Sequence, residues 1–354
     1  MKYLLVTPEF PPDTGGVARY LGALAAEKDT RLAVASPHGP ILFRPDWNFW
    51  PRWLPLLWRL PSLIRANGSK VLIISHVLPY GYAALLSGLP YVVICHGLDV
   101  AAPRRRPWKR FWAGVALRRA SCVVVNSEAT KKIVLRYGVR ESRLRVIYPP
   151  PSWDPAEVGE RAETNLAERY NLFDKKVLLI AGRLVPRKGV DVALQIMPKV
   201  KERFSDARLL IAGEGPERPR LEQQAVNVGI KDSIIFLGKI SDAELRDAYS
   251  LAYAVLYPSQ ELPGDIEGFG IGAADAGLFS KPVIASRTGG LPEAVKDGVT
   301  GLLVPPDAPG ALLEAILGLL SSPESAKTLG EGGRRLAAQR TKISFRNAFF
   351  EALL

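Results

Sequence analysis

Two cations directly follow a buried apolar run in the second half of the chain. Arg183 and Lys188 lie in the segment Gly182–Gly189, after the run Val177–Ala181 and before a helix-length segment. Cations that leave a strand end suit a diphosphate, because its charge must be neutralised where water is excluded. The alternative interpretation is an exposed basic loop that binds nothing.

A pair of glycines follows the first apolar run in the same way. Gly15 and Gly16 come after Tyr3–Val6 and precede another helix-length segment. Glycines at a strand-to-helix turn let backbone N–H groups approach an anion, and the helix N-terminus adds about half a positive charge. A tight turn without a ligand fits these residues equally well, but equivalent loops in the two halves favour phosphate binding.

Carboxylates and a histidine are candidates for binding hydroxyl groups. Glu267 precedes an expected helix that contains Asp275, and His96 ends the apolar run Tyr91–Cys95. A side chain at the carboxyl end of a parallel strand faces the binding crevice of an open α/β sheet. Two acidic residues eight positions apart mean little alone. We interpret the other two histidines, His38 and His76, as structural.

The elements that must position these residues are parallel strands alternating with helices. Short Val/Ile/Leu runs without in–out alternation are typical of parallel strands covered on both faces. Their alternation with helix-length segments predicts βαβ units and doubly wound sheets. We expect strands at Tyr3–Val6, Leu32–Ala35, Val71–Ser75, Tyr91–Cys95, Cys122–Val125, Leu144–Ile147, Val177–Ala181, Leu209–Ala212, Ile234–Leu237, Ala252–Leu256 and Pro282–Ala285.

The length of the chain and a proline-rich segment near its middle predict two domains. At about 150 residues per domain, 354 residues suggest two. The boundary is expected between Pro149 and Lys176, where three prolines give way to a polar segment. We therefore predict an α/β fold of two Rossmann-like doubly wound domains that face a central cleft. Helix starts are also visible, since Ser241 and Glu244 form a capping box and Ser127 is an N-cap.

Composition excludes several classes of protein. Hydrophobic residues make up 47% and charged residues 23%, which is usual for a soluble globular protein. The only cysteines, Cys95 and Cys122, lie in apolar runs and indicate a reducing compartment without a metal cluster. The uncharged stretch 71–98 is interrupted by prolines and glycines, so we predict a buried βαβ unit there and no membrane span.

Together these residues resemble glycosyltransferase family 4, the retaining nucleotide-sugar enzymes with the GT-B fold. The matching segments run in family order along nearly the whole chain. They are PPDTGGVAR, HGLDV, NSEATKKIV, GRLVPRKGVD, IAGEGPER, FLGKISDAEL, EGFGIGAADAG and PVIASRTGGLPEAVKDGVTGLLVPP. The resemblance extends to bacterial mannosyl- and glucosyltransferases that act on lipid or polysaccharide acceptors. It implies an acceptor domain 1–170, a donor domain 171–338 and a last helix, 339–354, that packs back on the first domain.

The resemblance also implies roles for individual residues. The catalytic set is His96, Arg183, Lys188 and Glu267. The donor is held by Gly15, Gly16, Gly182, Arg183, Lys188, Lys239, Ile240, Glu267, Phe269, Gly270, Ile271 and Asp275, and the acceptor by Asp13 and Arg19. Within these sets the family expects Glu267 to bind the sugar and Lys239–Ile240 to lie against the base. Asp275 departs from the family pattern, which has Glu there and expects that acid to bind the ribose of the nucleotide.

Three alternatives carry less weight. A nucleotide-dependent oxidoreductase needs G-x-G-x-x-G, but Arg218 occupies the position of the third glycine after Gly213 and Gly215. A GT-B sugar-nucleotide epimerase lacks the EGFG helix start. A nucleic-acid-binding protein rests on the net charge of +12 alone.

For the reaction, we expect front-face transfer of a hexose from a GDP-mannose or UDP-glucose type of donor, with retention. The departing diphosphate takes the acceptor proton. No Asp-x-Asp occurs in the chain, so we expect no cofactor and no metal. A soluble acceptor is the alternative to a membrane-associated one.

The first half of the chain carries the excess of positive charge. Residues 1–172 hold 24 Lys+Arg against 13 Asp+Glu, and all seven tryptophans. Mixed aromatics and cations suit the headgroup level of an anionic bilayer. The alternative is a core of tryptophans with a solvated basic face. We expect a cytoplasmic protein on the inner face of the membrane, docked through Trp50, Trp53, Arg104, Arg105, Arg106, Lys109 and Arg110, and no nucleic-acid partner.

Overall fold

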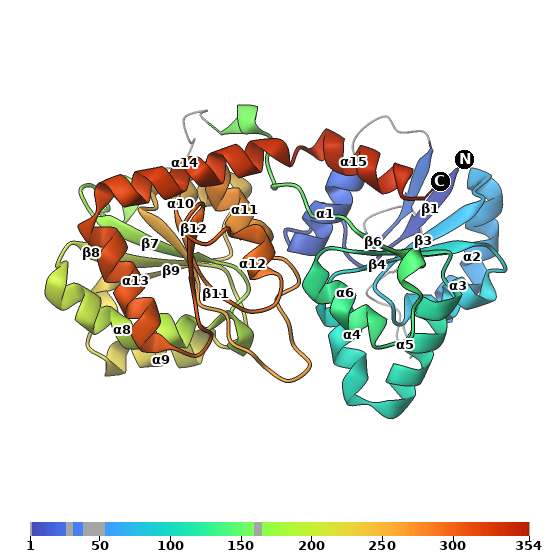
Figure 1. Cartoon of the computed structure of the whole chain (residues 1–354), viewed down its shortest axis with the longest axis horizontal. Helices are drawn as coiled ribbons and strands as arrows, with labels where there is room; N and C mark the ends of the chain where they lie inside the picture. The colour runs from blue at the N-terminus through green and yellow to red at the C-terminus, as the bar shows by residue number, and fades with distance from the viewer. Residues whose placement is uncertain (1, 26–30, 38–53, 159–164, 354) are drawn as a thin grey trace. The chain divides into compact units, whose positions relative to one another are not determined.

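The computed structural model describes residues 2–25, 31–37, 54–158 and 165–353. The chain divides into two compact units, which are described separately. Unit 1 comprises residues 1–150, 263–269 and 342–354, and unit 2 comprises residues 151–262 and 270–341 (Figure 1).

The described residues of unit 1 form a six-stranded parallel sheet. Its order is β2-β1-β3-β4-β5-β6, so the direction of winding reverses between β1 and β3. The central strands are buried along their whole length, as their uninterrupted apolar sequences require. The strands are β1 (Tyr3–Val6), β2 (Leu32–Ala35), β3 (Val71–Ser75), β4 (Tyr91–Cys95), β5 (Cys122–Val125) and β6 (Leu144–Val146).

Helices of unit 1 cover this sheet. They are α1 (Gly16–Leu24), α2 (Leu54–Asn67), α3 (Tyr80–Leu86), α4 (Leu98–Ala101), α5 (Pro107–Arg119), α6 (Glu128–Leu135) and α15 (Lys342–Glu351). The side chain of Ser127 accepts the N–H of Thr130, so the predicted cap of α6 is confirmed. The last helix, α15, packs onto α1 and β1 through Phe345 against Tyr20 and Phe350 against Tyr3.

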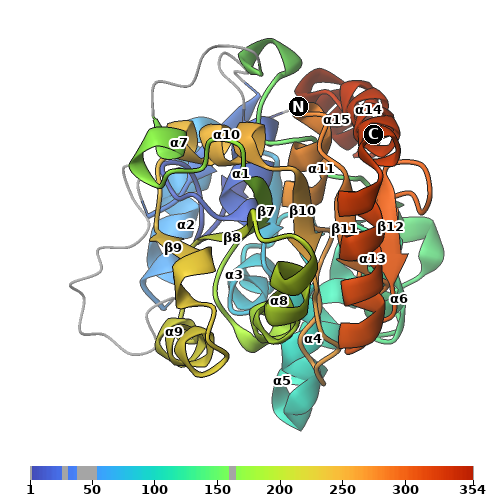
Figure 2. The ribbon, with the colours of Figure 1, turned by 90° about the vertical axis from the view of Figure 1, so that its left-hand side faces the viewer.

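The described residues of unit 2 form a second six-stranded parallel sheet, in the order β12-β11-β10-β7-β8-β9. The reversal here lies between β7 and β10, as in a Rossmann fold. Figure 2 shows the sheet between helices on either face. Its strands are β7 (Lys176–Ala181), β8 (Ala207–Ala212), β9 (Ile234–Gly238), β10 (Ala254–Tyr257), β11 (Val283–Ser286) and β12 (Gly301–Val304).

One helix of unit 2 begins with the cap that the sequence predicts. The capping box between Ser241 and Glu244 starts α10, so this prediction is confirmed. The helices are α7 (Leu166–Arg169), α8 (Val190–Arg203), α9 (Arg218–Asn227), α10 (Asp242–Leu251), α11 (Ile271–Leu278), α12 (Leu291–Ala294), α13 (Pro309–Ser321) and α14 (Pro323–Gln339).

The predicted strands all occur, each within two residues of its expected ends, and both cysteines are buried. The short edge strand β12 was not predicted from the sequence, and its central residues are half-buried. The uncharged stretch 71–98 forms β3, α3 and β4. Within the described ranges, no helix is both long enough and apolar enough to cross a membrane.

The division between the units lies within the window expected from the sequence, Pro149 to Lys176, although earlier than the domain end expected at residue 170. It falls after Pro150, because the next residues already belong to the core of unit 2. The ring of Trp153 lies 5.9 Å from that of Tyr249 and 5.8 Å from that of Phe279. In addition, residues 263–269 group with unit 1 although their neighbours in the sequence lie in unit 2.

Candidate functional site

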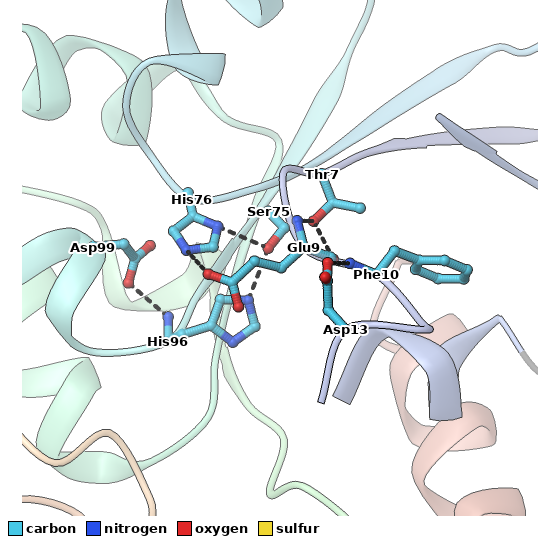
Figure 3. A network of polar contacts seen from close by, with 8 residues as sticks. All are labelled: Thr7, Glu9, Phe10, Asp13, Ser75, His76, His96 and Asp99. Atoms are coloured by element: carbon cyan, nitrogen blue, oxygen red, sulfur yellow. Dashed lines mark hydrogen bonds and ion pairs between the residues drawn. The ribbon is translucent and has the colours of Figure 1, made fainter. Parts of the chain in front are cut away.

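A polar network occupies the place in unit 1 where the winding of its sheet reverses. Ligands of open α/β sheets bind beyond the carboxyl ends of the strands at such a reversal. Glu9 follows β1 there, His76 follows β3 and His96 follows β4. Figure 3 shows these three side chains converging, with Ser75 in contact with both imidazole rings.

His96 is the predicted catalytic residue of this network, and its ring is held on two sides. Its Nε2 lies 3.0 Å from Ser75 Oγ, and its ring meets Tyr20 edge-on with centroids 5.2 Å apart. Burial, with a smaller contribution from His76, lowers the pKa of His96 well below its ordinary value. The imidazole is therefore neutral at pH 7, which suits a hydrogen bond to an uncharged group better than a salt bridge.

The backbone of His96 is also fixed by side chains. The N–H of His96 donates to Asp99 Oδ1 at 2.8 Å, and its carbonyl accepts from Asn126 Nδ2 at 3.1 Å. Burial raises the pKa of the Asp99 carboxyl. The carboxylate of Asp99 thus binds the main-chain N–H of His96 just after the end of β4.

The loop that carries Glu267 lies against the backbone of His96. A Cβ added to Gly268 would come within 2.0 Å of the carbonyl oxygen of His96, and one added to Gly97 within 2.8 Å of the Cα of Gly268. Only glycines allow main chains to approach this closely. The structure therefore brings together the loops of two predicted catalytic residues, Glu267 and His96. Phe269, which follows, is buried beside Tyr148.

The predicted phosphate turn forms the N-terminus of α1. Gly15 is its N-cap residue and Gly16 its first residue. The carboxylate of Glu9 lies next to this turn, since a Cβ on Gly15 would be 3.4 Å from Glu9 Oε2. The predicted acceptor residues are nearby in sequence: Asp13 accepts the N–H of Phe10, and Arg19 Nε donates to the carbonyl of Thr14.

The cationic loop of unit 2 leaves β7, one of the two strands at which the winding of that sheet reverses. Arg183 is exposed, and no described carboxylate forms an ion pair with it. Lys188 lies along Gly182, where an added Cβ would be 3.4 Å from Lys188 Cε, and its Nζ is 5.7 Å from the ring centroid of Tyr257. The two predicted cations therefore share one edge of the sheet.

Backbone crowding holds this loop in place. A Cβ on Gly213, at the end of β8, would lie 1.9 Å from the carbonyl oxygen of Gly182. A Cβ on Gly189 would lie 1.8 Å from the carbonyl oxygen of Pro258, at the end of β10. Close backbone approach thus requires glycine at positions 189 and 213, and it fixes the loop that carries the two cations at this edge.

The segment predicted to face the nucleobase follows β9 at the same edge. Lys239 is exposed and Ile240 half-buried, immediately before the cap of α10. Gly238, which precedes them, adopts a positive φ of 71° and lies against the paired side chains of Glu214 and Arg218.

The helix start after Glu267 has the geometry expected for N–H donors. Gly270 is the N-cap of α11 in the left-handed region, with φ 89°, and Ile271 is the first helical residue. The first N–H groups of any helix lack intrahelical acceptors, so they are available to an anion.

Asp275 within α11 has a structural partner. It is 4% exposed, and its two oxygens accept the backbone N–H of Ser152 at 2.6 Å and the hydroxyl of Ser152 at 2.8 Å. This acid holds the start of the unit 2 chain against α11. Its role toward a ribose stays a prediction.

The residues predicted to dock on a membrane differ in their surroundings. On α5, Trp108, Phe111 and Trp112 are exposed by 55, 60 and 41%, beside the cations Lys109 and Arg110. Arg106 is exposed as well, and Arg105 lies along Gly264. Arg104 instead lies over the ring of Tyr137, 5.8 Å from its centroid. Trp50 and Trp53 fall outside the described residues, as does His38.

Two residues of the network in unit 1, His76 and Glu9, were not predicted to belong to the site. His76 was interpreted as structural and Glu9 was assigned no role, yet Glu9 Oε1 lies 3.8 Å from His76 Nε2, and the ring of His76 lies beside that of His96 at the reversal point. His76 directly follows a predicted parallel strand, as His96 does, and this position could have indicated that His76 belongs to the site. Among the described residues, no group of three or more His, Cys, Asp or Glu side chains is arranged so that it could hold a metal ion.

Known families match both halves of the chain. The family model described as Glycosyltransferase Family 4 matches residues 14–150, and that described as Glycosyl transferases group 1 matches residues 163–336. The chain is 29% identical over 384 residues to the GDP-mannose-dependent alpha-(1-6)-phosphatidylinositol monomannoside mannosyltransferase of Mycolicibacterium smegmatis. That alignment covers 99% of this chain and 97% of the relative.

Solved structures share the fold. Anabaena HepE in complex with UDP-glucose matches with a TM-score of 0.84 at 20% identity, over 100% of this chain and 99% of that one. Sucrose-phosphate synthase from Thermosynechococcus elongatus matches with a TM-score of 0.81 at 24% identity, over 99% and 98% of the two chains.

Proposed function

This chain belongs to the glycosyltransferases of family 4 and group 1, and from that premise we propose its reaction. It is a glycosyltransferase with the GT-B fold that uses a nucleotide sugar. We propose that the donor is of the GDP-mannose or UDP-glucose type and that a hexose passes to a hydroxyl of a membrane-associated or glycan acceptor. The observation that carries the proposal is the cation pair Arg183 and Lys188, held at the reversal point of unit 2 by backbone crowding.

The donor diphosphate is assigned to unit 2. The guanidinium of Arg183 binds phosphate oxygens through two N–H groups, and Lys188 adds a point charge. The first N–H groups of α11, from Gly270 and Ile271, contribute further donors. As the glycosidic bond breaks, negative charge grows on the departing diphosphate, and these groups lower the barrier by stabilising that charge.

The sugar is assigned to Glu267 and His96. The carboxylate of Glu267 accepts hydrogen bonds from sugar hydroxyls, and the neutral imidazole of His96 makes a further polar contact. Transfer proceeds on the front face: the anomeric C1–O bond to the diphosphate breaks and the bond from C1 to the acceptor oxygen forms on the same side. The acceptor proton passes to the departing diphosphate oxygen, so the anomeric configuration is retained.

Donor identity is the first matter to test. Thermal shift with GDP, UDP and ADP should show one nucleotide raising Tm more than the others, because a ligand that binds only the folded protein stabilises it. Hydrolysis of the matching nucleotide hexose, followed by NMR of the anomeric product, then tests retention. No stabilisation by any of the three nucleotides would refute the proposed donor site.

The reaction is further proposed to need no metal. The absence of Asp-x-Asp from the sequence and the two cations at the diphosphate site support this. Transfer should continue in EDTA at its rate without EDTA. Activity lost in EDTA and restored by Mg²⁺ or Mn²⁺ would contradict the proposal.

A membrane-associated acceptor is supported by the surface of α5. Exposed Trp108 and Phe111 alternate with Arg106, Lys109 and Arg110, which matches the headgroup level of an anionic bilayer. Each cation near such a surface contributes about 1 kcal/mol. On this proposal the protein works at the inner face of the cytoplasmic membrane.

Sedimentation with vesicles of anionic phospholipid tests this surface. The protein should pellet at low salt and be released as salt rises, because charges are screened within roughly 10 Å at 0.1 M. Arg106→Glu with Arg110→Glu should abolish pelleting and leave nucleotide binding unchanged. A matched control is Arg334→Glu with Arg335→Glu on α14, which should pellet like the wild type. Protein that stays in the supernatant at low salt would favour a soluble acceptor.

A further inference from the structure

A single hydroxyl lies between the two histidine rings of unit 1. Ser75 Oγ is 3.0 Å from His96 Nε2 and 3.3 Å from His76 Nδ1 (Figure 3). A serine hydroxyl carries one proton, so it donates to one ring and accepts from the other. The direction of that hydrogen bond determines which nitrogen of His96 carries the proton of the neutral ring.

The direction is set at the far side of His76. Its Nε2 lies 3.8 Å from Glu9 Oε1, and a carboxylate favours a proton on the nitrogen that faces it. With the ring proton on Nε2, Nδ1 of His76 accepts a hydrogen bond from the hydroxyl of Ser75. Ser75 Oγ is then left to accept from His96, which places the proton of that ring on Nε2.

The backbone conformation of His76 supports a functional role for this hydrogen-bonded arrangement. His76 has a φ of 75°, in the left-handed region that residues other than glycine rarely adopt. Such conformations cost free energy and persist where the surrounding structure enforces them, often at functional sites. Its N–H donates to the carbonyl of Ile94 at 3.2 Å, which ties the end of β3 to β4.

We propose that Glu9, His76 and Ser75 form a relay that holds His96 as the Nε2–H tautomer, with Nδ1 bare. This proposal rests on the proposed function of His96 as a sugar contact and deepens it. A bare nitrogen accepts a hydrogen bond from a hydroxyl and repels a phosphate oxygen. The relay therefore makes His96 select a hydroxyl-bearing group of the substrate, and Ser75 and His76 are positioning residues.

Other titratable groups around His76 do not compete for the relay. Besides Glu9, it faces the ring of His96, with centroids 5.5 Å apart, and the buried carboxyl of Asp99. Asp99 Oδ1 accepts from the main-chain N–H of His96, and Tyr20 touches the ring through its edge. Among the described residues, Ser75 is the one hydrogen-bond partner of the His96 ring nitrogens.

NMR of the whole chain labelled with ¹⁵N-histidine tests the relay without any substrate. The chain has three histidines, so His38→Gln and His76→Gln assign the spectrum. At pH 8, His96 in the wild type should carry its proton on Nε2. In Ser75→Ala it should become a mixture of tautomers. In Glu9→Gln, whose amide can donate to His76 Nε2, it should shift toward the Nδ1–H form.

Controls separate the relay from folding. Glu9→Asp keeps the charge and should keep the wild-type tautomer, and Ser62→Ala, an exposed serine of α2, should leave the spectrum unchanged. Glu9 itself lies in a partly exposed loop, so its substitution leaves the core intact. Donor hydrolysis by Ser75→Ala and Glu9→Gln should fall about 10-fold, the scale of one hydrogen bond.

The outcomes distinguish this inference from the proposed function. A proton on Nδ1 of His96 in the wild type, or an unchanged tautomer in both Ser75→Ala and Glu9→Gln, would overturn the relay. If instead the tautomers respond as expected while no nucleotide sugar is bound or hydrolysed, the relay stands and the proposed reaction fails.

Discussion

Replacing Gly268 by alanine tests whether the contact between two loops of unit 1 positions the catalytic residues. The added Cβ would lie 2.0 Å from the carbonyl oxygen of His96 and 2.8 Å from Asn126 Nδ2, whereas ordinary contacts begin near 3.4 Å. The loop must therefore move by more than about 1 Å, or the strand end at His96 must give way. Both changes alter where Glu267 stands relative to His96.

The expected loss follows from that displacement. A misplacement of about 1 Å at a reacting centre costs on the order of 100-fold in rate. Crowding of a packed region also costs roughly 1–3 kcal/mol of stability. Gly268→Ala should thus lower kcat for transfer about 100-fold with a modest fall in Tm. The assays are product formation at saturating donor and thermal unfolding by circular dichroism.

A matched control distinguishes crowding from the substitution itself. Gly310 lies in α13, and a Cβ there would meet nothing within 4 Å. Gly310→Ala should keep the wild-type rate and gain a little stability, because alanine favours the helix by about 1 kcal/mol over glycine. If Gly268→Ala keeps both the wild-type kcat and the wild-type Tm, the contact does not position Glu267.

Three further predictions concern other residues. Arg183→Ala or Lys188→Ala should lower the rate at saturating donor about 100-fold, the scale for removing one stabilising donor; wild-type rates in both would remove them from the site. Asp275→Asn should lower stability by about 1–2 kcal/mol, since an amide cannot accept from both groups of Ser152; additive losses in a double-mutant cycle with Ser152→Ala, measured by urea unfolding, would contradict this. The lowered pKa of His96 means that, as pH falls below about 6.5, the unfolded chain gains a proton that the folded chain does not. Stability should therefore fall more steeply between pH 7 and 5.5 in the wild type than in His96→Gln, as Tm measured across that range would show.

Local sequence patterns determined most of the scaffold of this protein. Uninterrupted Val, Ile and Leu runs marked the buried strands, because a strand covered on both faces has no polar position to fill. Caps such as Ser127 and Ser241 marked helix starts through hydrogen bonds that span three residues. The edge strand β12 was not predicted, although three of its four residues, Leu302, Leu303 and Val304, are apolar.

The candidate site was only partly visible in the sequence. Residues that follow strands are recognisable as a class, so the sequence alone predicts His96, Arg183 and Lys188 as site residues. The hydrogen bonds from Ser152 to Asp275 could not be predicted from the sequence, because they join a loop to a helix far along the chain. The close approach of Gly97 and Gly268 could not be predicted either, because no local sequence pattern indicates it.

The tertiary structure decided which strand ends meet. Apolar runs specify that a segment is a buried strand, but the order of strands follows from how the connecting helices pack on the sheet. Pairing of β1 with β3 is what brings Glu9 beside His76, and pairing of β3 with β4 brings His76 and Ser75 beside His96. Hydrogen bonds and charges act over a few ångströms of space, so the chemistry of these residues exists only once the sheet has assembled.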